Sequence, residues 1–150
     1  MSGRIVVGVD DSPGAAAALR WALEEARLRG ATLDVVHAWH QFIPVALPGA
    51  VTREPGRDDL EAAARELVTK VVDDVVGPSD PTVTVRVELG QGSPADVLIT
   101  GAADADLLVI GSRGRGGFAG LLLGSVSQQC AHHAPCPVVI VPTTKGSAAR

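Results

Sequence analysis

The chain has 150 residues, 46% hydrophobic and 20% charged, which suits one globular domain with a sizeable core. No apolar run approaches the ~20 residues of a membrane span, and a strand-like run by residue 4 leaves no room for a signal peptide. Two cysteines without an export signal do not indicate a disulfide framework. We therefore expect a cytoplasmic protein, without a membrane partner, whose residues 1–150 form a single domain ending in a disordered tail at 143–150.

The net charge of −4 is distributed unevenly along the chain. All 17 acidic residues lie at or before Asp106. The charged residues of 107–150 are all basic: Arg113, Arg115, Lys145 and Arg150. Such a field favours a small anion near the basic segment and repels nucleic acid from most of the surface, so we expect no nucleic-acid partner. Chance together with a solvated basic tail is the plainer alternative.

Apolar runs alternate with segments of helical periodicity from one end of the chain to the other. Runs typical of strands occupy residues 4–10, 32–39, 82–89, 107–110 and 138–141. Helical spacing or capping residues mark residues 15–29, 60–76, 93–103 and 125–133. Alternating strands and helices predict an α/β fold with a parallel sheet and helices on both faces. Residues 40–56 are predicted to be a long loop, either a binding segment or a flap over apolar surface.

A glycine-rich segment with two arginines follows the strand predicted at 107–110, and it ends at Gly124-Ser125 before a helix. Glycines let backbone N–H groups approach an anion, and a helix N-terminus supplies unpaired donors, so the segment predicts a phosphate site. Ligands of such folds bind beyond the carboxyl ends of the strands, where the strand order reverses. If the first and fourth strands are neighbours, Asp10 lines the same crevice and can accept hydrogen bonds from a sugar or base. Asp10 could instead be a turn or cap residue.

Two well-known phosphate motifs do not describe this segment. The P-loop needs a lysine, and residues 107–142 contain none. The letters of a dinucleotide-binding fingerprint occur at residues 114–119, but they follow the fourth strand and no acid lies about 20 residues further on.

A third pattern fits fully: Gly111, two residues, Gly114, nine residues, then Gly124-Ser125. It resembles the ATP-binding loop of the universal stress protein family. The segments I-V-V-G-V-D-D-S, S-P-A-D-V-L-I, A-D-L-L-V-I-G-S-R-G-R-G-G and P-C-P-V-V-I-V-P also resemble that family, so the resemblance covers residues 4–142.

The resemblance implies a Rossmann-like fold, similar to the adenine nucleotide alpha hydrolases, with a five-stranded parallel sheet in the order 3-2-1-4-5. It implies ATP as the ligand, often with a divalent metal such as Mg²⁺ or Mn²⁺, and a homodimer formed through the last strand, Val138–Val141. An apolar edge strand favours such pairing. By position, the resemblance places the phosphates and ribose at Gly111, Arg113, Gly114, Gly124, Ser125 and Val126. It places the adenosine end at Asp10 and the adenine at the backbone of Val36, His37 and Ala38.

No general base is evident in the loop, because no acid follows Asp106. We therefore assign no catalytic residue and expect a nucleotide-dependent stress-response regulator with slow or no ATP turnover. A nucleotide hydrolase or phosphotransferase on the same scaffold is the alternative. The cluster Cys130, His132, His133 and Cys136 matches no ordinary zinc spacing, so no metal site is assigned to it.

Overall fold

The computed structural model describes residues 3–40, 49, 56–78, 81–112 and 123–143. Most of the predicted loop at 40–56, the residues Arg113 and Gly114, and the predicted tail beyond Thr143 lie outside these residues. In the described parts, no helix combines the length and the hydropathy needed to cross a bilayer.

The described residues form one parallel sheet of five strands in the order β3-β2-β1-β4-β5, which confirms the predicted order. The strands are β1 (Arg4–Gly8), β2 (Thr32–Trp39), β3 (Val85–Gln91), β4 (Leu107–Gly111) and β5 (Val138–Val141). The connecting helices are α1 (Pro13–Arg29), α2 (Arg57–Val76), α3 (Pro94–Gly101) and α4 (Ser125–His133). The predicted α/β fold is therefore confirmed.

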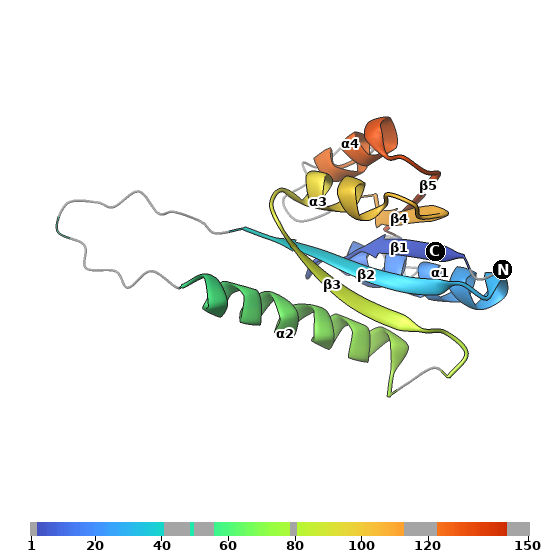
Figure 1. The fold of residues 1–150 in the computed structure, drawn as a ribbon, viewed down its shortest axis with the longest axis horizontal. Coiled ribbons are helices and arrows are strands. Elements are labelled where there is room, and N and C mark those ends of the chain that lie inside the picture. Colours follow the sequence, from blue (N-terminus) through green and yellow to red (C-terminus); the bar gives the residue numbers. More distant parts are fainter. Residues whose placement is uncertain (1–2, 41–48, 50–55, 79–80, 113–122, 144–150) are drawn as a thin grey trace, which may run out of the picture.

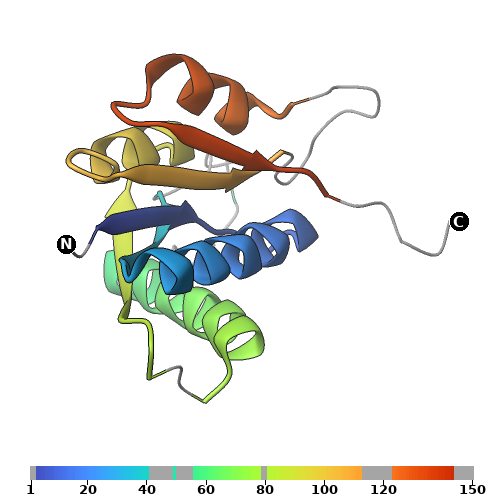
Figure 2. The same ribbon diagram turned by 90° about the vertical axis from the view of Figure 1, so that its right-hand side faces the viewer.

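The helices cover both faces of the sheet, with α1 and α2 on one face and α3 and α4 on the other (Figures 1 and 2). Successive side chains of a strand point to opposite faces, so β1 supplies both hydrophobic layers. Val7 belongs to the cluster with α1 and α2, whereas Val6 belongs to the cluster with α3 and α4. Burial on both faces explains why β1 and β4 are continuous apolar runs.

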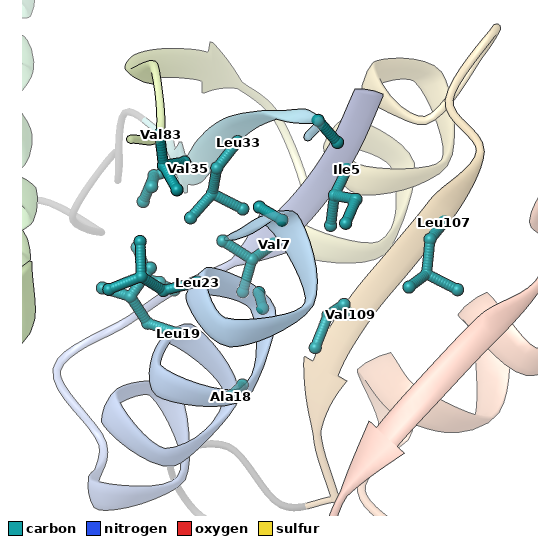
Figure 3. Packing of buried hydrophobic residues seen from close by; sticks show 14 of the residues in the cluster. Ile5, Val7, Ala18, Leu19, Leu23, Leu33, Val35, Val83, Leu107 and Val109 are labelled. Atoms are coloured by element: carbon teal, nitrogen blue, oxygen red, sulfur yellow. The ribbon is translucent and has the colours of Figure 1, made fainter. Parts of the chain in front are cut away.

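The larger cluster lies between the sheet and α1 (Figure 3). Leu19 and Leu23 of α1 face the side chains of Val7 in β1 and Val35 in β2. Leu19, Val7 and Val35 have no exposed surface. This packing fixes α1, and with it the turn that joins the end of β1 to the start of α1.

Several predicted boundaries were wrong at the ends. The strand predicted at 82–89 lies at Val85–Gln91, because pairing with β2 sets its register: Leu33 pairs with Val85 and Trp39 with Gln91. The strand predicted at 4–10 ends at Gly8, although the Val9 N–H still donates to the Val36 carbonyl at 3.0 Å. Helices α1 and α2 begin earlier than predicted, and α3 ends at Gly101 rather than residue 103.

A buried carboxylate joins β1, β2 and β3 toward their amino ends. Asp34 has no exposed surface, and its oxygens accept from Arg4 Nε at 2.6 Å and from Arg86 Nε at 2.7 Å. Arg4 also donates to the carbonyls of Gly101 and Ala103 at the end of α3. Burial raises the pKa of Asp34, but the hydrogen bonds and charges of Arg86 and Arg4 outweigh it and hold the pKa below its ordinary value.

Candidate functional site

The carboxyl ends of β1 and β4 lie side by side, because Ile5 pairs with Leu107 and Val7 with Val109. The first and fourth strands are therefore neighbours, which is the condition for Asp10 and the glycine-rich segment to lie at one crevice. The chain runs from β1 outward through β2 and β3, then returns to place β4 on the other side of β1. This is the point where ligands bind in open parallel sheets. Figure 2 shows β1, β4 and β5 ending toward the same side of the molecule.

Gly111 ends β4 against the first turn of α1. A β-carbon built on Gly111 would lie 3.1 Å from the carbonyl oxygen of Gly14 and 3.2 Å from its carbonyl carbon. Because the crowded atoms belong to the backbone, a methyl group here would require the strand or the helix to shift by a few tenths of an ångström. Gly111 therefore has a packing reason to be glycine that is independent of any ligand.

The N-terminus of α4 differs from those of α1 and α3. The hydroxyls of Ser12 and Ser93 cap α1 and α3, accepting from Ala15 N at 3.3 Å and from Asp96 N at 3.4 Å. The N-cap of α4 is Gly124, which makes no side-chain cap hydrogen bond. Ser125, the first residue of the helix, is exposed. Uncapped N–H groups at a helix start suit an anion.

Asp10 follows β1 and is partly buried. Its Oδ1 accepts from the Ser12 N–H at 2.8 Å and also from the Ser12 hydroxyl. The turn interpretation of Asp10 is therefore correct for this oxygen, which helps to shape the start of α1. The interaction with a sugar stays a prediction.

The predicted adenine-contact stretch lies at the end of β2, next to the end of β1. The Val36 carbonyl accepts from Val9 N, and the His37 ring nitrogen Nδ1 donates to the Val9 carbonyl at 2.8 Å. A carbonyl can only accept, so Nδ1 carries the proton. Val36 and His37 thus hold the residue that precedes Asp10, while Ala38 is partly buried beyond them.

Two serines join the described ends on either side of residues 113–122. The Ser112 carbonyl accepts from Gly124 N at 2.7 Å and from the Ser127 hydroxyl at 3.0 Å. Ser112 N donates to the Val141 carbonyl at 2.9 Å, which connects the site to β5. Sequence reasoning assigned no role to Ser112 or Ser127. A signal existed, because Ser127 lies three residues before Cys130 on the inward side of α4, where a polar group must find a partner.

The two cysteines pack with the hydrophobic core. Cys130 is fully buried beside Leu108 and Ile110, and this burial raises its pKa to about 11. Cys136 is partly buried against the same cluster, and burial followed by the charge of Asp106 raises its pKa. Across the residues that the structure describes, no three His, Cys, Asp or Glu side chains are grouped so as to hold a metal ion.

Comparison with known proteins gives consistent matches. The model of the universal stress protein family matches residues 1–142. The universal stress protein Rv2623 of Mycobacterium tuberculosis is 39% identical over 144 residues, an alignment that covers 91% of this chain and 46% of the relative. This chain thus spans about half the length of the curated relatives that it matches.

Solved structures resemble the whole chain. A universal stress protein in complex with cAMP has a TM-score of 0.61 and 26% identity, with 95% of this chain and 98% of the other covered. The universal stress protein of Archaeoglobus fulgidus in complex with dAMP has a TM-score of 0.58 and 26% identity, with 93% and 97% covered. Together with the sheet order and the match over residues 1–142, these comparisons establish that the chain belongs to the universal stress protein family.

Proposed function

We propose that this protein binds ATP at the carboxyl edge of β1 and β4 and acts as a nucleotide-dependent regulator in a stress response. The observation that carries the proposal is the N-terminus of α4, which has no side-chain cap among the residues that the structure describes and begins at a hydrogen bond to the end of β4. A helix start of this kind stabilises phosphate through its N–H groups and its dipole. It lies where the strand order reverses, which is the position of ligands in this class of sheet.

The parts of the nucleotide are assigned to successive parts of this edge. We assign the phosphates and ribose to Gly111, Arg113, Gly114, Gly124, Ser125 and Val126. Asp10 is assigned to the ribose, and the backbone of Val36, His37 and Ala38 to the adenine. Binding of cAMP and dAMP by two structural neighbours supports an adenine nucleotide. The two arginines and the glycines of residues 111–117 favour a ligand with several phosphates.

We propose Mg²⁺ or Mn²⁺ as a partner of the bound phosphates. Asp10 and Asp11 are the carboxylates that follow β1 at this edge. Asp10 already accepts two hydrogen bonds from Ser12 through one oxygen, which suits a fixed hydrogen-bond acceptor better than a general base that must take up a proton. We therefore propose slow or no ATP turnover, and no catalytic residue is assigned.

Calorimetric titration with ATP, with and without Mg²⁺, tests the proposal. We expect saturable binding by the wild type and its loss in Gly114→Ala. Gly101→Ala is the matched control, because a β-carbon there would meet only Val36 methyl groups at ordinary contact distances of 3.9 and 4.0 Å. ATP binding that Gly114→Ala retains, or no binding by the wild type, would contradict the nucleotide site. ATP hydrolysis at a rate typical of enzymes, lost in Gly114→Ala, would establish the hydrolase alternative instead.

We also propose a homodimer through β5, within a cytoplasmic protein whose residues 1–150 form one domain. Strand β5 pairs with β4 on one side and ends the described sheet on the other, and its four residues are all apolar and partly exposed. An unpaired apolar edge favours pairing with a second copy. Light scattering at micromolar concentration should give twice the monomer mass. A monomer under those conditions would exclude this interface as a stable one.

A further inference from the structure

The hydroxyl of Ser127 lies between two backbone carbonyls that belong to different parts of the proposed site. It is 3.0 Å from the Ser112 oxygen, just after β4, and 3.0 Å from the Gly124 oxygen at the N-cap of α4. Ser127 is only 2% exposed, so water does not compete for the hydrogen bonds of this hydroxyl. One O–H group therefore serves both carbonyls, shared between them or alternating.

Ser112, which accepts from the Ser127 hydroxyl, is itself held in place by several hydrogen bonds. Its N–H donates to Val141 at 2.9 Å, its hydroxyl accepts from Thr143 N at 3.3 Å, and its carbonyl also accepts from Gly124 N at 2.7 Å. Its N–H and its hydroxyl oxygen thus bind β5 and the segment that follows it, while its carbonyl binds the start of α4. Ser112 is therefore held by the sheet, directly after β4, independently of its bonds to α4.

We propose that Ser127 is a positioning residue for phosphate binding. Its hydrogen bond to Ser112, directly after β4, fixes the orientation of the first turn of α4. This inference depends on the proposed nucleotide site. The Ser127 hydroxyl is within hydrogen-bond distance of both carbonyls, and without it each keeps, among the described residues, only a backbone donor, Gly124 N for Ser112 and Gln128 N for Gly124. Gly124 N still donates to Ser112, but the first turn of α4 loses its second hydrogen bond to that carbonyl, and the N–H groups of Ser125 and Val126 are then held less firmly in one direction.

The effect should depend on which part of the ligand is present. Within the group of residues assigned to the phosphates and ribose, the N–H groups at the start of α4 suit a phosphate, whereas the end of β2 is assigned to the adenine. Ser127→Ala should therefore weaken ATP binding about tenfold, which corresponds to ~1.4 kcal/mol. Adenosine has no phosphate, so a change that acts only on phosphate binding should not affect it. The affinity of Ser127→Ala for adenosine should therefore stay within about twofold of the wild-type value.

Calorimetric titrations with ATP and with adenosine, on the wild type and on the variants Ser127→Ala, Ser127→Thr and Gln129→Ala, test this inference. Ser127→Thr keeps the hydroxyl and should restore most of the ATP affinity. Gln129→Ala changes an exposed residue of the same helix and should change neither affinity. If Ser127→Ala does not fold, as judged by its melting transition, then Ser127→Cys replaces it, since the thiol has similar volume and is only a weak donor.

The possible results separate this inference from the proposed function. Loss of ATP affinity with adenosine affinity retained supports the positioning role. Equal affinity for ATP in the wild type and Ser127→Ala overturns that role and leaves the nucleotide site intact. An equal loss for ATP and adenosine also overturns it, because Ser127 would then act on the whole fold. No binding of ATP by the wild type overturns the proposed function, and this inference with it.

Discussion

Replacing Asp34 with alanine should lower the free energy of unfolding by about 2 kcal/mol, because two partly exposed arginines lose the buried carboxylate that accepts their hydrogen bonds. Asp34 is fully buried and accepts hydrogen bonds from both Arg4 and Arg86. Its removal leaves two guanidinium groups without the charge that they face, and one of them also holds the end of α3. Urea denaturation monitored by circular dichroism measures the change.

Two comparisons make the Asp34 result specific. Glu66→Ala removes an exposed acid from α2 and should change stability by no more than about 0.5 kcal/mol.

Asp34→Asn keeps the shape of the side chain but cannot ionise. The pKa of Asp34 is lowered in the folded protein, so its charge stabilises the fold at pH above the ordinary value of about 3.9. The advantage of the wild type over Asp34→Asn should therefore be full near pH 7 and shrink as the pH falls below about 4. A loss under about 1 kcal/mol in Asp34→Ala would mean that the arginines find other partners.

Leu19→Ala should destabilise the protein by about 3 kcal/mol, within the range for large-to-small changes in a packed core. Leu19 has no exposed surface and packs toward Val7 and Val35 from α1 (Figure 3). Leu28→Ala is a matched control on the same helix. Leu28 is 82% exposed, so this substitution should change the free energy of unfolding by less than about 0.5 kcal/mol. Denaturant midpoints of the two variants check the prediction. Equal stability of the two would show that α1 does not pack on the sheet as described.

Much of the fold follows from patterns that are local in the sequence. The bounds of β2, α4 and β5 were predicted correctly, because apolar β-branched runs and the Gly124-Ser125 start are local signals. The start of β3 was wrong, since its register is set by β2, about 50 residues earlier. No local pattern contains that information.

The candidate site was predictable in position but not in detail. The strand order placed Asp10 and Gly111 at neighbouring strand ends, and pairing of β1 with β4 bears out that neighbourhood. The hydrogen bonds that bring Ser127 to Ser112 depend on how α4 sits over the sheet, which periodicity does not specify. The Asp34 network was missed for a similar reason, because its partners lie 30 and 52 residues away in the sequence.

Ser112 connects two surfaces whose proposed roles differ, the nucleotide site and the edge of the sheet. One of its hydrogen bonds reaches Val141 at the end of β5, and another reaches Gly124 at the start of α4. A second copy that pairs with β5 would alter the strand that holds Ser112. Any factor by which assembly changes nucleotide affinity must equal the factor by which nucleotide changes assembly. If the protein both binds nucleotide and dimerises through β5, Ser112 would link the two equilibria, and the subunit concentration would then influence how much nucleotide is bound.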